Sequence, residues 1–461
     1  MSETTYDVRI WEYSAIKGKT RTTHRVRWVV GGKTWTKSFG TKQLAMSHRS
    51  KLLTAAREGQ AFDVATGLPV SMVPKSAGVT WFDHAQAFAS VRWPELAPRS
   101  RRSLAEGLTA VTPALLEDAS DRPSDDDIRH TLLTYAFRAS NEHPDETAAR
   151  VLPWIEEHSL PLDALTDPTV TRRCLELIST TLDGGTAAPT TFARKRATLY
   201  GTLKYAVELG RLPFHPLDRV SWKRPRSTDA VDPASVVNPR QARALLTAVT
   251  YVDPAMEAFY ALMYFAALRP AEAAHIKAAD LDLPADGWGT LTLVGSTQRS
   301  GALWTDDGNA HEDRELKHRA VRTRRTVPAS PDLCRTLRHH LDAYGTGPGG
   351  RLFVTRTPRT RVPLPGDLAR PVSPSIYGRK WQRARAYAFP PEQVASPLAA
   401  RPYDLRHACV STWLAAGVSP AQVAQWAGHG VAVLLRTYTH AIDGGQAEAL
   451  RRIDDQLGKR C

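Results

Sequence analysis

Two stretches without hydrophobic periodicity, residues 61–78 and 213–237, interrupt this chain of 461 residues. Both contain prolines and small polar residues, which is typical of connections between domains. A chain of this length exceeds one ordinary hydrophobic core, and roughly two to four domains are expected. The two stretches therefore read as linkers, and they predict three domains over residues 1–60, 79–212 and 238–461.

The first segment has the composition of a small β-sheet. Residues 6–12 and 23–30 are rich in Val, Trp, Tyr and Thr, which strands favour. A pair of glycines then leads into a third strand near residues 34–39. Thr41 can cap a helix that follows this strand. The segment thus predicts a three-stranded sheet plus one helix.

Positive charge is concentrated in the same segment. The formal net charge of the chain is +14, and residues 1–75, with 13 Lys/Arg against 5 Asp/Glu, contribute +8 of it. Such an excess favours a polyanionic partner, most simply nucleic acid. A sheet placed in the major groove is one way to read DNA, and a solvated sheet face is the competing interpretation. The candidate DNA-binding residues on or beside the strands are Arg21, Arg25, Arg27, Lys33 and Lys37.

Residues 79–212 have helical periodicity throughout, and prolines separate the helices. The last helix, near residues 191–209, has an apolar stripe formed by Leu199, Leu203 and Ala206. A basic edge beside this stripe suits contact with backbone phosphates, although a merely solvated face explains that helix equally well. The candidate DNA-binding residues of this helix are Arg194, Lys195, Arg196 and Lys204.

The third segment combines many helices with a few strands. Helical patterns cover about 240–250 and 256–268, and strand-like runs follow near 288–294 and 320–327. Further helices continue to about residue 437. The predicted fold class is therefore a multidomain, mainly α chain with small β-sheets, whose last domain is an α-rich mixed α+β unit.

The chain lacks the sequence motifs of several functional classes. The four cysteines are far apart and form neither a zinc motif nor a disulfide framework. We find no Walker loop and no carboxylate cluster of the two-metal type. The N-terminus has no apolar signal core, and the longest apolar run, residues 258–268, is too short to span a bilayer. We expect no metal, no nucleotide cofactor and no membrane partner.

Residues suited to chemistry at a phosphodiester gather near the C-terminus. Arg406 is followed by a Gly-His pair ending at His429, and then by Tyr438. An arginine can donate two hydrogen bonds to phosphate oxygens, a histidine can accept or donate a proton, and a tyrosine can act as nucleophile. Far upstream, Arg269 ends an apolar helix and precedes a proline. Taken singly, each is better explained as a core or salt-bridged residue, but the ordered set favours phosphoryl chemistry.

The ordered set resembles the signature of the tyrosine recombinases of the phage-integrase type. That signature has an arginine after a hydrophobic helix, a basic hairpin residue, a His-x-x-Arg box, a Gly-His pair, and a tyrosine followed two residues later by histidine. The matching segments here are Ala267-Leu268-Arg269, Lys317, Tyr403-Asp404-Leu405-Arg406, Gly428-His429 and Tyr438-Thr439-His440. The resemblance is strongest over the third domain. It also implies that residues 79–212 are a helical, SAM-like core-binding domain and residues 1–60 an arm-type DNA-binding domain.

Two positions of this signature differ from the others. Tyr403 stands where the family usually has histidine, and a phenol can donate a hydrogen bond to a phosphate oxygen but carries no positive charge. Lys317 precedes the run Arg-Arg-Thr-Val-Pro at residues 324–328, which resembles the strand that follows the family's lysine. Lys277 is the alternative lysine.

The resemblance implies a site-specific DNA recombinase, an integrase of a phage or integrative element that forms a 3′-phosphotyrosyl intermediate. In this family the residue matching Tyr438 attacks the phosphate, and those matching Arg269 and Arg406 neutralise its charge. Lys317 would protonate the leaving 5′-oxygen. His429 would orient the phosphate or assist with the tyrosine proton. Neither ATP nor a metal is needed, because one phosphodiester replaces another.

The implied partners are double-stranded DNA at core and arm attachment sites and three further copies of the chain in a homotetramer. An excisionase or a host DNA-bending factor is a further possible partner, and the setting is the bacterial cytoplasm at the nucleoid. Two alternatives stay open. A type IB topoisomerase-like enzyme uses the same chemistry but rejoins the same strand, and a catalytically silent relative only binds DNA.

Overall fold

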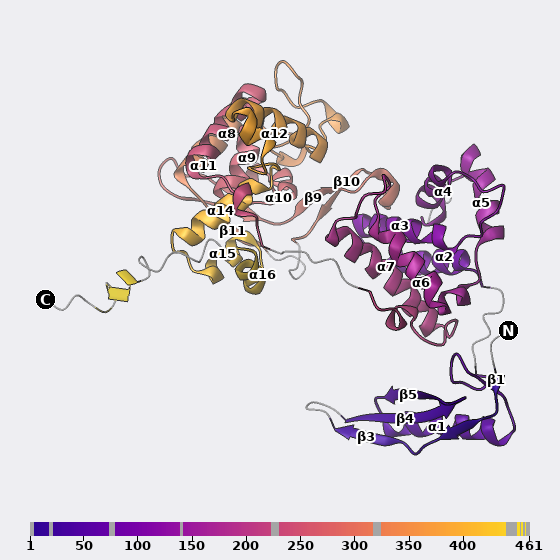
Figure 1. Ribbon diagram of the computed structural model, residues 1–461. Helices are drawn as coiled ribbons and strands as arrows, with labels where there is room; N and C mark the ends of the chain where they lie inside the picture. The colour runs from indigo at the N-terminus through magenta and orange to yellow at the C-terminus, as the bar shows by residue number, and fades with distance from the viewer. Residues whose placement is uncertain are drawn as a thin grey trace. The chain divides into compact units, whose positions relative to one another are not determined.

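The computed structural model describes residues 4–17, 22–72, 79–138, 142–222, 230–316, 324–438 and five residues between 450 and 457. The chain divides into two compact units, Met1–Arg226 and Ser227–Cys461, and each is described by itself (Figure 1). The division falls within the stretch 213–237 that the sequence marks as a linker.

The first unit begins with the predicted sheet. Its central strand, β4 (Thr22–Val30), pairs antiparallel with β5 (Lys33–Phe39) along one edge. Two short strands, β2 (Val8–Ile10) and β3 (Ser14–Lys17), pair with opposite ends of β4 along its other edge. The first predicted strand is thus a broken strand, and the sequence analysis missed its second half.

One helix covers a single face of this sheet. α1 (Lys42–Arg57) begins after Thr41, whose hydroxyl accepts a hydrogen bond from a backbone N–H of the first turn, as the sequence predicts. The helix packs against Val26 and Trp28 of β4 in a small apolar core. A two-residue pairing of β1 (Thr4–Thr5) with β6 (Phe62–Asp63) joins the two ends of the module. The opposite face of the sheet has no helix on it in the described residues.

Helices make up the rest of the first unit. Three of them begin with proline in the first helical position, where the missing N–H costs no hydrogen bond. The last helix buries Leu199, Leu203 and Ala206, as its apolar stripe predicts. The helices are α2 (Trp81–Arg92), α3 (Pro98–Val111), α4 (Asp125–Thr131), α5 (Glu146–His158), α6 (Pro168–Ser179) and α7 (Pro189–Glu208).

The second unit is built around a helical core beside a small sheet. Four helices enclose the aromatic side chains Tyr260, Phe353 and Trp381: α8 (Pro239–Val252), α9 (Glu257–Phe265), α11 (Pro331–Tyr344) and α12 (Pro374–Ala388). The sheet has the antiparallel order β11-β8-β7, formed by β7 (Leu281–Asp282), β8 (Gly289–Leu293) and β11 (Arg325–Ala329). Two short helices, α10 (Pro270–His275) and α13 (Pro391–Ala395), follow α9 and α12 along the chain.

Three C-terminal helices lie together in the second unit (Figure 1). They pack around a second apolar cluster. They are α14 (Asp404–Ala415), α15 (Pro420–Ala427) and α16 (Val431–Thr437). Their shared core includes Val410, Val423 and Leu434, together with Tyr438 immediately after α16. The predicted nucleophile, Tyr438, therefore lies inside an apolar core and not on the surface.

The polar stretch between residues 295 and 317 contains a hairpin that the sequence analysis did not predict. β9 (Ser296–Arg299) pairs antiparallel with β10 (His311–Arg314). At its base, Thr297 Oγ1 donates to Asp313 Oδ1 at 2.6 Å and accepts from Arg351 Nη1 at 2.9 Å. His275 Nδ1 lies 2.9 Å from the same hydroxyl. This network fixes the hairpin to the C-terminal end of α10.

Helices and small antiparallel sheets in more than one unit are the predicted fold class, which is confirmed. No helix within the described ranges is long and apolar enough to cross a bilayer.

Candidate active site

Arg269 is held at the junction between α9 and α10. The chain leaves α9 through Ala267, whose φ of 51° is in the left-handed region, and Arg269 is the N-cap of α10. Its backbone N–H and its Nη1 donate to the Glu272 carboxylate at 2.8 and 2.9 Å. Its Nη2 donates to the carbonyl of Gly428 at 2.7 Å. The guanidinium is thus fixed between one carboxylate and one carbonyl.

Glu272 is the anion around which the cations are arranged. Only 3% of the residue is exposed, and both carboxylate oxygens accept from the guanidinium of Arg325, at 2.9 and 2.8 Å. Burial alone would raise the pKa of this carboxyl, but Arg325, Arg269 and Arg406 together lower it to about 2. The sequence analysis missed Glu272 and Arg325. Glu272 is three residues after the N-cap Arg269 and accepts from its backbone N–H, as the acid of a capping box does, and this spacing is the signal that could have found the acid.

Arg406 is completely buried in the first turn of α14. Its Nη1 donates to the carbonyl of Ala267, and its Nη2 donates to that of Ala427 at 2.7 Å. The same Nη2 lies 2.6 Å from His429 Nε2. The guanidinium therefore connects the α9–α10 junction, the end of α15 and the candidate histidine.

The glycine of the Gly-His pair has a steric role. Gly428 ends α15 with a φ of 66°, which a side chain disfavours. A Cβ atom at this position would collide with the Arg325 guanidinium and press on that of Arg269. The absence of a side chain lets both cations approach the turn that carries His429.

His429 is a neutral imidazole in this environment. Burial, and then the positive charges of Arg406 and Arg269, lower its pKa to about 3. Because Arg406 donates to Nε2, the ring proton resides on Nδ1. The ring lies nearly parallel to that of Tyr438, with 6.1 Å between centroids.

Tyr438 is fully buried next to these groups. Burial raises the pKa of its phenol, and the nearby charge of Arg406 offsets this only in part. Its hydroxyl lies 2.8 Å from Nδ1 of His407, one residue after Arg406 on α14. The sequence analysis assigned no role to His407, although the residue directly follows the arginine of the box.

Tyr403 borders the same cluster. Its ring is edge-on to His407, with 5.0 Å between centroids, and the Arg406 guanidinium carbon is 5.8 Å from the ring centre. Tyr403 is the N-cap of α14, with helical backbone angles, and His407 is four residues later, so the two side chains share one face.

The candidate lysine, Lys317, lies outside the described residues, between the end of β10 and the start of β11. His440 also lies outside them. The alternative lysine, Lys277, is half-buried beside a short 3-10 helix (Ala278–Asp280), where its backbone N–H donates to Asp280 at 2.9 Å.

The structure separates the basic residues of the N-terminal sheet into two groups. Arg25 and Arg27 are exposed, and the alternation along β4 directs them to the face away from α1. Lys33 and Lys37 pair across the sheet with Val30 and Val26, so they belong to the face that carries α1. Only the first pair therefore shares the open face, while Arg21 lies outside the described residues.

The basic residues of α7 also differ in position. Arg194 and Lys204 are exposed and line a groove of about 610 Å³ beside α3. Each has an acidic neighbour, Glu106 at 3.4 Å and Glu208 at 3.7 Å. Lys195 and Arg196 are half-buried and do not line this groove.

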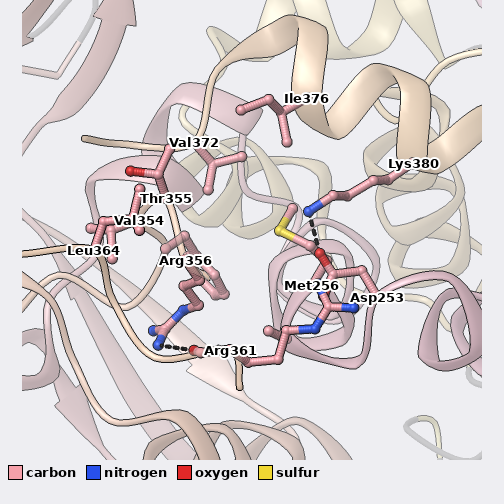
Figure 2. Close-up of a pocket in the computed structure, with 12 residues that line it drawn as sticks. Asp253, Met256, Val354, Thr355, Arg356, Arg361, Leu364, Val372, Ile376 and Lys380 are labelled. Atoms are coloured by element: carbon pink, nitrogen blue, oxygen red, sulfur yellow. Dashed lines mark hydrogen bonds and ion pairs between the residues drawn. The ribbon is translucent and has the colours of Figure 1, made fainter. Parts of the chain in front are cut away.

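A separate cavity of about 220 Å³ lies elsewhere in the second unit (Figure 2). Its charged groups are held by each other, since Asp253 binds Lys380 and lies 3.2 Å from Arg361. Arg356 is occupied by backbone carbonyls, among them that of Leu352 at 2.8 Å. Among the described residues no group of three or more His, Cys, Asp or Glu side chains could hold a metal ion. The cluster around Arg406 is therefore the better candidate for chemistry.

The sequence matches no protein-family model and no curated protein. Among solved structures, it is similar to the Tn1549 transposon integrase in complex with a circular intermediate DNA, with 15% identity, a TM-score of 0.48, and coverage of 68% of this chain and 95% of that chain. The XerH site-specific recombinase bound to a palindromic difH substrate is 12% identical, with a TM-score of 0.42 and coverage of 77% of this chain and 96% of that chain. The catalytic domain of bacteriophage HP1 integrase is 14% identical, with a TM-score of 0.27 and coverage of 47% of this chain and 94% of that chain. These similar structures are integrases and a site-specific recombinase.

Proposed function

We propose that this chain is a site-specific DNA recombinase of the tyrosine recombinase family, which cleaves and rejoins DNA through a 3′-phosphotyrosyl intermediate. One observation carries the proposal. Arg269, Arg406, His429 and Tyr438 come from separate elements, and hydrogen bonds and ring contacts bring them into one cluster. Separate explanations for each residue would not require them to meet.

The proposed reaction begins when the Tyr438 hydroxyl attacks a DNA phosphate and releases a 5′-hydroxyl. Arg269 and Arg406 stabilise the charge that develops on the non-bridging oxygens, because their guanidinium groups are already fixed before the substrate arrives. Glu272 holds Arg269 and Arg325 in place, so it is a positioning residue. His429 is neutral, and its Nδ1–H is available to donate to a phosphate oxygen. In the second step a 5′-hydroxyl of the partner DNA displaces Tyr438.

Further residues have roles in the proposed reaction and in DNA binding. Lys317 is proposed to protonate the leaving 5′-oxygen, and Tyr403 to donate a hydrogen bond to the phosphate. The open face of the N-terminal sheet, with Arg25 and Arg27, would bind arm-type DNA, and the groove beside α7 would contact core DNA. We propose a homotetramer on two duplexes that integrates and excises a phage or integrative element. An excisionase or a host DNA-bending factor would set the direction.

A nicked suicide duplex tests this function. The duplex spans the joined ends of the mobile element that carries the gene, and the nick lets the 5′-hydroxyl product diffuse away. We expect the full-length chain to form a covalent protein–DNA adduct that survives denaturing electrophoresis, and we expect Tyr438→Phe to form none. If the wild-type chain forms no adduct while it shifts the duplex in a gel, it is a DNA-binding protein. Relaxation of a supercoiled plasmid without strand exchange between two plasmids would indicate a topoisomerase-like enzyme instead.

A further inference from the structure

The attack by Tyr438 needs a proton acceptor, because the nucleophile is a neutral phenol. The residue is fully buried, and burial raises the pKa of its hydroxyl above the usual value. A phenol is a weak nucleophile until its proton is removed. The cluster must therefore contain a group that touches this hydroxyl and can take its proton.

His429 is poorly suited to this task. Its Nε2 already accepts a hydrogen bond from Arg406 Nη2 at 2.6 Å. Burial and the charges of Arg406 and Arg269 lower its pKa to about 3, which makes the imidazolium form strongly unfavourable. Its contact with Tyr438 is between ring faces, with 6.1 Å between centroids.

His407 has the required geometry. Its Nδ1 is 2.8 Å from the Tyr438 oxygen, within the range of a hydrogen bond from a hydroxyl to a ring nitrogen. His407 lies in α14, whereas Tyr438 directly follows α16. The edge-on ring of Tyr403, the N-cap of α14, packs against the imidazole and limits its rotation.

His407 also has access to solvent, which a proton acceptor needs in order to exchange its proton. The residue is half-buried, and it lines a hollow of about 450 Å³ in the second unit. Thr437, Arg401 and Asp404 line the same hollow. Tyr438, in contrast, is completely buried, so His407 lies between the nucleophile and an open space.

We propose that His407 is the general base of the cleavage step and accepts the Tyr438 proton at Nδ1. This inference rests on the proposed recombinase function. The O–H bond of Tyr438 breaks as its oxygen forms a bond to phosphorus, and the proton moves to Nδ1. The phosphorus–O5′ bond breaks with its electron pair, and the leaving oxygen takes a proton from a separate acid to become a 5′-hydroxyl. In rejoining, the attacking 5′-hydroxyl loses its proton to that acid group, and Tyr438 leaves as it regains the proton from His407.

Two substitutions separate proton acceptance from positioning. His407→Asn keeps an oxygen near the place of Nδ1, so it can accept the Tyr438 hydrogen bond, but an amide does not take up the proton. His407→Gln provides a second variant whose amide does not take up the proton, and the one that retains the wild-type melting temperature is used. His339→Asn, which changes an exposed histidine of α11, is the matched control. All are measured as full-length chains on the nicked suicide duplex, beside the wild type and Tyr438→Phe.

We expect the amide variant to shift the duplex as the wild type does and to form the covalent adduct about 10²–10⁴-fold more slowly. A duplex with a 5′-bridging sulfur at the scissile phosphate needs no proton on its leaving group, and we expect it not to restore the rate. Adduct formation at the wild-type rate by the amide variant would overturn the base role while leaving the recombinase function intact. Restoration by the bridging sulfur would also overturn it, because His407 would then serve the leaving group. Failure of the wild type itself would instead refute the proposed function.

Discussion

The arginines of the candidate site and those of the N-terminal sheet have opposite surroundings. Arg406 and Arg325 of the second unit are at most 2% exposed, and their guanidinium groups are bonded to backbone carbonyls or to Glu272. Arg25 and Arg27 of the N-terminal sheet are exposed on the face of the sheet opposite α1. The comparison shows that the same side chain can serve two physical purposes, and that burial distinguishes them.

The removal of a buried cation and the removal of an exposed one should affect the protein differently. A buried guanidinium has already lost its hydration, so it is fixed before substrate binds and contributes to both folding and transition-state stabilisation. An exposed guanidinium stays hydrated and mobile, and its attraction to DNA depends on salt. Substitutions of the buried charged groups of the candidate site should therefore couple stability to activity, whereas substitutions of Arg25 and Arg27 on the sheet should change DNA affinity alone.

The largest effect is expected for Arg406→Ala. It removes the donors that join Ala267, Ala427 and His429, and it removes one charge from the proposed transition state. We expect covalent cleavage of the suicide duplex to fall by at least about 10³-fold, together with a lower melting temperature. Arg406→Lys should be nearly as defective, since an ammonium group cannot reproduce the planar fork. Cleavage within tenfold of the wild type would contradict the catalytic assignment.

Glu272→Gln should come next, with its main effect on stability. The amide cannot balance Arg325 and Arg269, so two buried or half-buried cations lose their anion. We expect the free energy of unfolding to fall by about 3–5 kcal/mol in urea titrations. The control is Asp332→Asn, which breaks the more exposed pairs with Arg243 and Arg335 and should cost less than about 1 kcal/mol. An equal decrease in the free energy of unfolding for the two variants would show that the buried pairs stabilise the fold no more than the exposed pairs.

On the sheet, the double substitution Arg25→Ala with Arg27→Ala should weaken DNA binding without lowering the melting temperature. We expect the slope of log affinity against log salt for arm-type DNA to decrease by about 1 per lost phosphate contact, while core-site cleavage persists. Lys33→Ala with Lys37→Ala removes equal charge from the α1 face and should change the slope less. If both pairs give the same change, charge alone rather than the face explains binding.

The smallest effect is expected for Tyr403→His. Arg406 and Arg269 already supply positive charge at this site, so one added imidazole should change the cleavage rate by no more than about tenfold, or 1.4 kcal/mol. Tyr403→Phe, measured in the same assay, isolates the contribution of the hydroxyl. A change of more than a hundredfold in Tyr403→His would show that the phenol has a larger role than a supporting hydrogen bond.

Features encoded locally in the sequence could be predicted from it. Thr41 caps α1 and the apolar stripe of α7 is buried, because both follow from patterns within one element. The hairpin of β9 and β10 was missed because its residues are polar and show no apolar alternation. The faces of Lys33 and Lys37 depend on the register between β4 and β5, which the turn at Gly31-Gly32 sets.

The same distinction applies to the candidate site. Arg269, Arg406, His429 and Tyr438 stand in recognisable local motifs, and the structure brings them together. Arg325 and Glu272 meet across 53 residues of sequence, and His407 and Tyr438 across 31. No local pattern predicts such contacts, because they depend on how α10, β11, α14 and α16 pack against one another.

The most direct test of the central claim is to identify the residue that becomes attached to DNA. The full-length chain is allowed to react with the suicide duplex, the adduct is digested with protease and nuclease, and the modified peptide is sequenced by mass spectrometry. The account predicts a single attachment through the oxygen of Tyr438 to a 3′-phosphate. Attachment at any other residue, or an adduct that persists in Tyr438→Phe, would contradict it.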